Sequence, residues 1–212
     1  MIKKILFLIK GNLLWVGAAG VLAGLLGSWG LYEGLHRTSN DKFCVVCHEM
    51  RPMVAAYHDD VHGGAGKSGM RVNCVACHLP QDNLFSYIFT KAKNGVVEGS
   101  IHFFGNPDKI NWHENRARRQ EFVYDKGCLS CHANYVTNEL ISTKAREMHA
   151  HYVKLKDTPQ SIGCSSCHVE TGHKGLKNVL NYYAPEYEFY RGKMAEKRDE
   201  TEQKLTQRLN KE

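Results

Sequence analysis

The sequence has no cysteine outside a Cys-x-x-Cys pair. All eight cysteines fall into pairs with two residues between them, so none remains for a disulfide bond or a lone reactive thiol. The pairs are Cys44/Cys47, Cys74/Cys77, Cys128/Cys131 and Cys164/Cys167. A histidine follows each second cysteine: His48, His78, His132 and His168. A zinc ribbon would need the cysteine pairs but gives no reason for the four histidines.

The repeated Cys-x-x-Cys-His pattern is the attachment motif of c-type haem. Two thiols at this spacing can each bond one vinyl side of a porphyrin, and the next residue then lies under the iron, where an imidazole can bind it. Four motifs therefore predict four covalently attached haem c groups. These large apolar cofactors would supply much of the core of a chain that is only 42% hydrophobic.

Charged residues are absent from residues 11–32, a stretch about as long as the roughly 20 residues needed to cross a bilayer. Three lysines precede it, so the positive-inside rule predicts a cytoplasmic N-terminus and a periplasmic remainder. A cleaved signal peptide is the alternative, but it would have a shorter apolar core and a small-x-small cleavage site. Trp29 and Tyr32 suit a membrane interface, so we expect an uncleaved, single-pass anchor in the bacterial inner membrane.

Small residues recur along this stretch at every fourth position: Ala19, Ala23 and Gly27, with Gly20, Gly24 and Ser28 beside them. Such a stripe lets two helices approach closely and would allow a homodimer, whereas a Gly-rich span that packs on nothing is an equal alternative. The formal net charge is +6, and haem propionates, absent from this count, would offset it. We therefore expect no binding of nucleic acid.

Signals for β-strands are poor, and we predict a mainly α fold with much irregular loop. The expected divisions are residues 1–34 for the cytoplasmic N-terminus and anchor, 35–184 for a small periplasmic tetrahaem domain and 185–212 for a charged tail, exposed as a helix or disordered. Apolar residues at helical spacing predict a helix from Leu84 to Glu98. A free histidine lies between the motifs of each pair, His62 in the first and His149 in the second, which suggests two dihaem halves.

Eight histidines lie outside the motifs: His36, His58, His62, His102, His113, His149, His151 and His173. A haem used only for electron transfer usually has two strong axial ligands, which keep the iron low-spin and exclude small molecules. Four of these histidines could therefore complete the coordination, but spacing alone does not choose among them.

Several short stretches, taken together with the anchor and the order of the motifs, carry a resemblance. They are Cys44-Val45-Val46-Cys47-His48-Glu49-Met50, His62-Gly63-Gly64, Cys77-His78-Leu79-Pro80, Met148-His149, and His173 five residues after His168. From residue 1 to about residue 175 the chain resembles the NapC/NirT/NrfH family of membrane-anchored quinol dehydrogenases.

The resemblance implies axial ligands for the haems. His62 matches the distal ligand of the third haem, His173 that of the second and His149 that of the fourth. For the first haem it implies ligation by Met50, with the motif's own His48 as the alternative ligand. A thioether is a weaker donor than imidazole and tends to raise the reduction potential. Packing of Met50 on the porphyrin, without ligation, stays open.

The resemblance also implies a quinol site beside the first haem, made by a lysine and an acid seven residues further on. Lys91 and Glu98 have this spacing, about two helical turns, so they would share one face of a helix. Glu98, longer than the aspartate common in the family, would accept a proton or hydrogen bond, and Lys91 would orient the quinol. A solvated charged pair is the alternative. Lys93 and His102 are weaker candidates.

These features predict a cytochrome that oxidises a membrane quinol, expected to be menaquinol. Electrons would pass through four haems to a periplasmic reductase of nitrogen-oxide respiration, either a multihaem or a molybdenum enzyme. His149 within the chain favours a self-contained haem set. The alternative is an anchored electron-transfer module that lacks a quinol site and receives electrons from another membrane enzyme. A terminal reductase with an open haem is disfavoured because all four motifs are ordinary.

Overall fold

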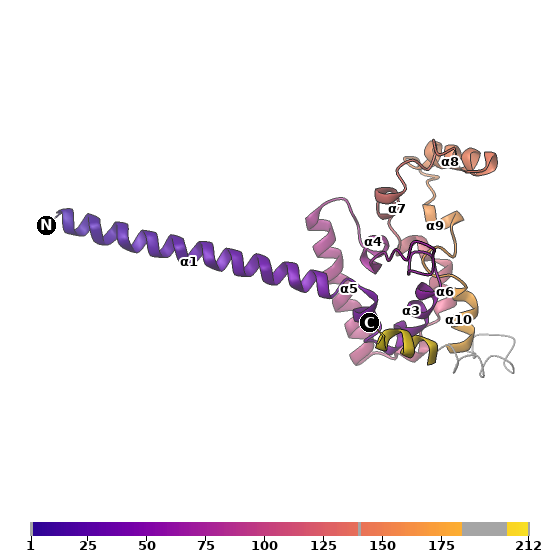
Figure 1. Cartoon of the computed structure of the whole chain (residues 1–212), viewed down its shortest axis with the longest axis horizontal. Helices are drawn as coiled ribbons and strands as arrows, with labels where there is room; N and C mark the ends of the chain where they lie inside the picture. The colour runs from indigo at the N-terminus through magenta and orange to yellow at the C-terminus, as the bar shows by residue number, and fades with distance from the viewer. Residues whose placement is uncertain (1, 140, 184–202, 212) are drawn as a thin grey trace.

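One long helix projects from a head of short helices and loops in the computed structural model, which describes residues 2–139, 141–183 and 203–211 (Figure 1). This helix, α1, spans Ile2–Arg37, and its 36 residues make it about 54 Å long. From Asn12 onward its side chains contact almost nothing in the head. In the described part of the chain it is the helix long and apolar enough to cross a membrane.

The head is helical. Its helices are α2 (Asp41–Cys44), α3 (Arg51–His58), α4 (Cys74–His78), α5 (Leu84–Phe104), α6 (Trp112–Ala117), α7 (Asp125–Cys131), α8 (Thr143–Leu155), α9 (Cys164–Cys167) and α10 (Leu176–Tyr183). Short 3₁₀ turns occur at His48–Met50, Pro107–Lys109 and Arg119–Glu121. The described residues form no strand, only an isolated bridge between Gly63 and Arg71. The predicted mainly α fold is therefore confirmed.

Local sequence signals set the ends of the two longest head helices. The Asn83 side chain accepts a hydrogen bond from the backbone N–H of Ser86 and starts α5, which continues six residues past the predicted end at Glu98 and stops before Gly105. Ser142 caps α8 in the same way, through the N–H of Ala145. Both helices therefore begin where a short polar side chain satisfies a free backbone N–H.

The protein's own apolar core is small. Val54, Ala55 and Ala56 of α3 pack with Val179 of α10, and the last member of the cluster is Leu205 near the C-terminus. Large apolar cofactors in the head would add the buried surface that so few side chains cannot supply.

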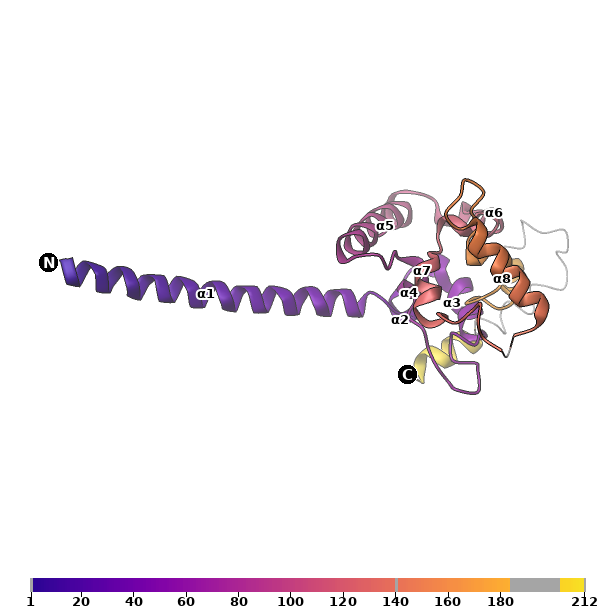
Figure 2. The same ribbon diagram turned by 90° about the horizontal axis from the view of Figure 1, so that it is seen from above.

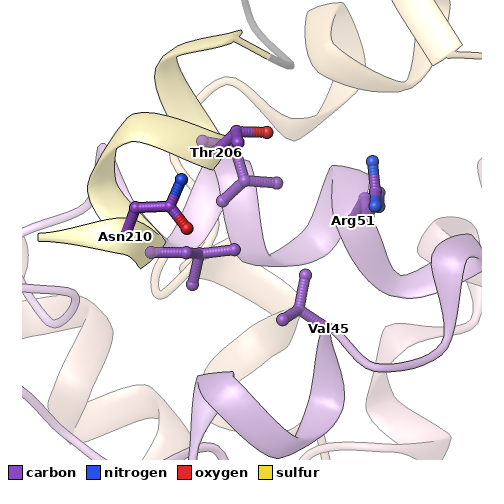
Figure 3. Close-up of a pocket in the computed structure, with 6 residues that line it drawn as sticks. Val45, Arg51, Thr206 and Asn210 are labelled. Atoms are coloured by element: carbon purple, nitrogen blue, oxygen red, sulfur yellow. The ribbon is translucent and has the colours of Figure 1, made fainter. Parts of the chain in front are cut away.

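The C-terminal end of the chain packs on the head through one buried side chain. Residues 203–210 form a helix whose Leu205 is only 3% exposed, and Arg208 pairs with Asp59 at 3.0 Å. A cavity of about 210 Å³ opens between this helix and the first motif, lined by Val45 and Arg51 on one side (Figure 3). Residues 203–210 thus form a mostly exposed helix, one of the two states expected for the tail, and Leu205 is the buried side chain that packs it on the head. Residues 184–202 lie outside the described residues.

The four motifs follow one another through the head in chain order. The side chains of Cys44 and Cys74 lie close together, so the first motif adjoins the second. α4 packs on α7, so the second motif adjoins the third. α7 also packs on α9, so the third motif adjoins the fourth. The motifs therefore form one continuous row, and the expected division into two dihaem halves stays a prediction.

Candidate functional site

Three pairs of histidine rings face each other across the head. Ring centres are 6.2 Å apart for His62 and His132, 6.0 Å for His78 and His173, and 6.1 Å for His149 and His168. Each pair joins one motif histidine to one histidine from elsewhere in the chain. An imidazole nitrogen binds a metal at about 2 Å and lies about 1 Å from its ring centre, so two rings on opposite sides of one iron have centres about 6 Å apart. The spacing fits three bis-histidine haems.

Hydrogen bonds orient these rings. Three of them donate from Nδ1 to a backbone carbonyl: His78 to Phe122 (2.9 Å), His149 to Tyr135 (2.7 Å) and His173 to Met53 (2.9 Å). His62 instead donates from Nδ1 to the side-chain carboxylate of Asp60 at 2.8 Å. A ring held through Nδ1 offers its Nε2 lone pair to a metal, which is the usual arrangement around metal-bound histidine.

Burial keeps two of these rings neutral. Desolvation lowers the pKa of His78, and desolvation together with the nearby His78 lowers the pKa of His173 to about 4. Only the neutral imidazole has a lone pair for iron. The second pair of rings is therefore held in the protonation state that ligation requires.

A fourth ring pair lies at the first motif and differs from the other three. The His48 and His102 centres are 5.8 Å apart. The His48 Nε2 lies 3.2 Å from the Asp108 carboxylate, and its Nδ1 lies 3.5 Å from Glu49. His102 donates from Nδ1 to the same Glu49 at 2.9 Å. Both nitrogens of His48 thus face carboxylates, although the ring spacing of this pair is close to that of the other three.

The sequence did not predict that His102 lies in this cluster, and it indicated His102 only as a weak candidate for the quinol site. Ligand atoms of Cys47, Glu49 and His102 lie within 4.8 Å of one another. His102 and Glu49 are 53 residues apart in the chain, so no local spacing signals their contact.

One surplus histidine has a structural role. The Nε2 of His58 hydrogen bonds the Asp41 carboxylate at 2.7 Å, and its side chain is only 2% exposed. The nitrogen that would meet iron is therefore engaged, which removes His58 from the eight candidates.

Lys91 and Glu98 lie where the head meets the membrane-spanning helix. Lys91 Nζ donates to the carbonyl of Thr38 at 2.8 Å and to the hydroxyl of Ser39 at 3.1 Å, just past the end of α1. Partial desolvation lowers the pKa of Lys91 and raises that of Glu98, although Glu98 is still reached by solvent. The charges of both residues act on the Cys44 thiol, so both lie beside the first motif.

A membrane-spanning helix joined to a helical head with four Cys-x-x-Cys-His motifs defines the class of anchored multihaem c-type cytochromes. Residues 9–178 match the model of the NapC/NirT cytochrome c family, N-terminal region, and the chain belongs to this family. It is a membrane-anchored cytochrome c of quinol-linked electron transfer, and its cofactor is haem c. The apolar helix and the family together place it in the inner membrane as a single-pass protein.

Two relatives illustrate the similarity. The tetraheme c-type cytochrome CymA of Shewanella oneidensis is 28% identical over 176 residues, which cover 77% of this chain and 91% of CymA. The cytochrome c-type protein NapC of Escherichia coli is 30% identical over 174 residues, with 77% and 82% covered. Among solved structures, the cytochrome c nitrite reductase NrfHA complex bound to the HQNO inhibitor contains a chain that matches with 19% identity and a TM-score of 0.49, over 75% of this chain and 90% of that one.

Proposed function

We propose that this chain is a quinol dehydrogenase, which oxidises a membrane quinol, menaquinol, beside the first motif. Electrons then pass along the row of motifs to a periplasmic reductase of nitrogen-oxide respiration, of the nitrate, nitrite or hydroxylamine type. The observation that carries the proposal is the position of Lys91 and Glu98. Lys91 hydrogen bonds Thr38, just past the end of the membrane-spanning helix, and the charges of Lys91 and Glu98 both act on Cys44 of the first motif.

The chemistry of a quinol explains why these two side chains belong together. A quinol releases two electrons and two protons, and haem iron, when bound, accepts one electron at a time. Glu98 accepts the proton of a quinol hydroxyl, and its raised pKa brings it closer to the pH at which it must exchange protons. Lys91 holds the quinol oxygen through a hydrogen bond and stabilises negative charge as the proton leaves.

The ring pairs support an assignment of haem ligands. His132 with His62 would hold the third haem, His78 with His173 the second, and His168 with His149 the fourth. Two strong ligands for each iron would exclude small molecules, which suits relays rather than catalytic centres.

The first haem is different. The carboxylates that face both nitrogens of His48 support Met50 as the residue that would bind its iron. A thioether ligand would raise the potential of this haem relative to haems held by two histidines. A higher potential at the first haem favours acceptance of the electron from quinol.

The row of motifs gives electron transfer a direction. The first motif adjoins the membrane end, and α9, which carries the fourth, lies away from α1 (Figure 1). With the N-terminus in the cytoplasm, the head stands in the periplasm, and the fourth haem is the exit towards the reductase.

The experiment is quinol-dependent reduction of the haems in the full chain, purified with its haems and reconstituted in liposomes. Glu98→Gln should abolish fast reduction by menaquinol, while dithionite still reduces all haems. Glu147→Gln on α8, which changes an exposed glutamate far from the first motif, is the matched control. Unchanged menaquinol oxidation in Glu98→Gln would refute the site and favour an electron-transfer module fed by another membrane enzyme.

A further inference from the structure

α5 carries a row of exposed apolar side chains. Phe85, Phe89, Val96 and Phe103 follow one another at intervals of four, seven and seven residues, so they lie on one side of the helix. Their exposed fractions lie between 61% and 79%, and the Phe85 and Phe89 rings stack with centres 6.2 Å apart. These four side chains form what is called here the outer face of α5. Water-soluble surfaces rarely leave such a continuous apolar row uncovered.

The opposite side of the same helix faces the head. Lys91 follows Phe89 by two residues, which turns it about 200° around the helix axis. Its Nζ donates to the carbonyl of Thr38 and the hydroxyl of Ser39 at 2.8 and 3.1 Å. α5 is therefore fastened by its inner side to the chain segment that leaves the membrane, and its outer face points away from that attachment.

The position of α5 relative to α1 identifies what covers the outer face. α5 runs across the direction of α1 and lies beside the end of α1, on the side of the head nearest the anchor (Figures 1 and 2). If α1 crosses the bilayer, a helix that runs across it at this level lies along the membrane surface. Trp29 and Tyr32, exposed near the end of α1, are aromatic residues of the kind found at this depth.

We propose that α5 is an interfacial helix, whose outer face is immersed in the lipid headgroup and upper acyl region. An interfacial helix needs an apolar face and a polar face along its length, and α5 has the phenylalanine row on one side and Lys91 and Glu98 on the other. The occupant is lipid because α5 lies beside the membrane end of α1, whereas α7 and α9, which carry the third and fourth motifs, lie further from it (Figure 1). The chain thus contacts the bilayer through two helices, α1 across it and α5 along its surface.

This arrangement has a consequence for the quinol site, which rests on the proposed function. Lys91 and Glu98 lie on the helix that borders the lipid, so a quinol headgroup would reach them without leaving the membrane interface. The lipid contact itself depends on no quinol chemistry, and it is tested separately.

The test places a nitroxide spin label at Val96→Cys and, in a second protein, at Phe89→Cys. The full chain with its haems is reconstituted in nanodiscs of phosphatidylethanolamine and phosphatidylglycerol. The eight native cysteines are held in the haem motifs, so the new thiol is the one labelled. Collisions with oxygen, which concentrates in lipid, are compared with collisions with a water-soluble nickel chelate. The proposal expects the oxygen-to-nickel ratio at both positions to be several times that of the control.

The control label is Val153→Cys on α8, exposed and distant from the end of α1 (Figure 1). A nickel-dominated signal at Val96 and Phe89, equal to that at Val153, would overturn the proposal. It would also be overturned if the two labels became shielded only when a periplasmic reductase is added, since protein rather than lipid would then cover the face. An unchanged haem spectrum in each labelled protein shows that the head has folded. Loss of quinol oxidation with lipid contact intact would refute the proposed function alone.

Discussion

Lys91 donates a hydrogen bond from its Nζ to the backbone carbonyl of Thr38, and this bond links the longest helix of the head to the end of the membrane-spanning helix. The two residues are 53 positions apart in the chain. The contact fixes a cationic side chain, the first haem motif and the membrane boundary in one place. A quinol dissolved in the bilayer needs such a place to meet a haem.

Lys91→Gln is expected to slow menaquinol oxidation by about tenfold to a thousandfold, the range seen when one group that stabilises developing charge is removed. Lys93→Gln, two residues away and exposed, is the matched control and should keep the normal rate. Stopped-flow haem reduction in liposomes measures both. Equal rates for the two variants would contradict the role of Lys91.

The rate of menaquinol oxidation should depend on the ionisation of Glu98. Desolvation raises the pKa of Glu98 above its ordinary value. Only the carboxylate accepts a proton, so the rate rises with pH through this raised pKa and levels off above it. The pH profile of the wild-type chain should show this limb, and Glu98→Gln should remove it. A limb that persists in Glu98→Gln would belong to another group.

His149 and His151 give a matched pair on α8. His149→Ala should convert the fourth haem from low-spin to high-spin, because it removes the ring that faces His168 with centres 6.1 Å apart. His151→Ala should leave all haems low-spin, since it is exposed and two residues along α8 turn it about 200° around the helix axis from His149. Electron paramagnetic resonance and carbon monoxide binding distinguish the outcomes. Identical spectra for the two variants would disprove the ligand assignment.

The first haem can be tested through Met50. Met50→Leu should remove its thioether ligand and alter one haem of four, with a lowered potential or a new high-spin signal. His48→Gln should alter the spectrum much less, because the His48 nitrogens face Asp108 and Glu49. The opposite ranking, with His48→Gln as the damaging change, would make His48 the ligand and leave Met50 as a packing residue. Near-infrared magnetic circular dichroism, which detects methionine ligation, measures the difference.

The buried pair of Asp41 and His58 predicts a dependence of stability on pH. The hydrogen bond from His58 lowers the pKa of Asp41 below its ordinary value, so the folded protein holds this proton more weakly than the unfolded chain does. Its contribution to stability is complete above the unfolded pKa and is lost as the pH falls through the lowered folded pKa. Asp41→Asn should cost about 1–3 kcal/mol at neutral pH.

Chemical denaturation, followed by the haem absorbance, compares the two proteins. The difference in the free energy of unfolding between wild type and Asp41→Asn should become smaller as the solution is acidified below the ordinary pKa of aspartate. A gap that stays constant with pH would mean that the loss comes from packing and not from the ionised hydrogen bond.

The sequence by itself determined the covalent chemistry and the anchor. Cys-x-x-Cys-His is a local pattern, since two thiols and an imidazole must lie within one turn to meet one porphyrin, and nothing distant can change that. The apolar run after residue 10 is local for the same reason, because a bilayer selects on length and polarity alone. Helix starts such as Asn83 also depend on neighbours a few residues away.

Only the tertiary structure decided which residues from distant parts of the chain lie together. Among eight surplus histidines, spacing could not choose, whereas the fold engages His58 with Asp41 and brings His173 opposite His78. The attachment of α5 at Thr38 and the contact between Glu49 and His102 likewise have no local signal. Such contacts depend on how loops close and how helices pack. The free energies of loop closure and packing depend on the whole chain, so no short stretch of sequence predicts these contacts.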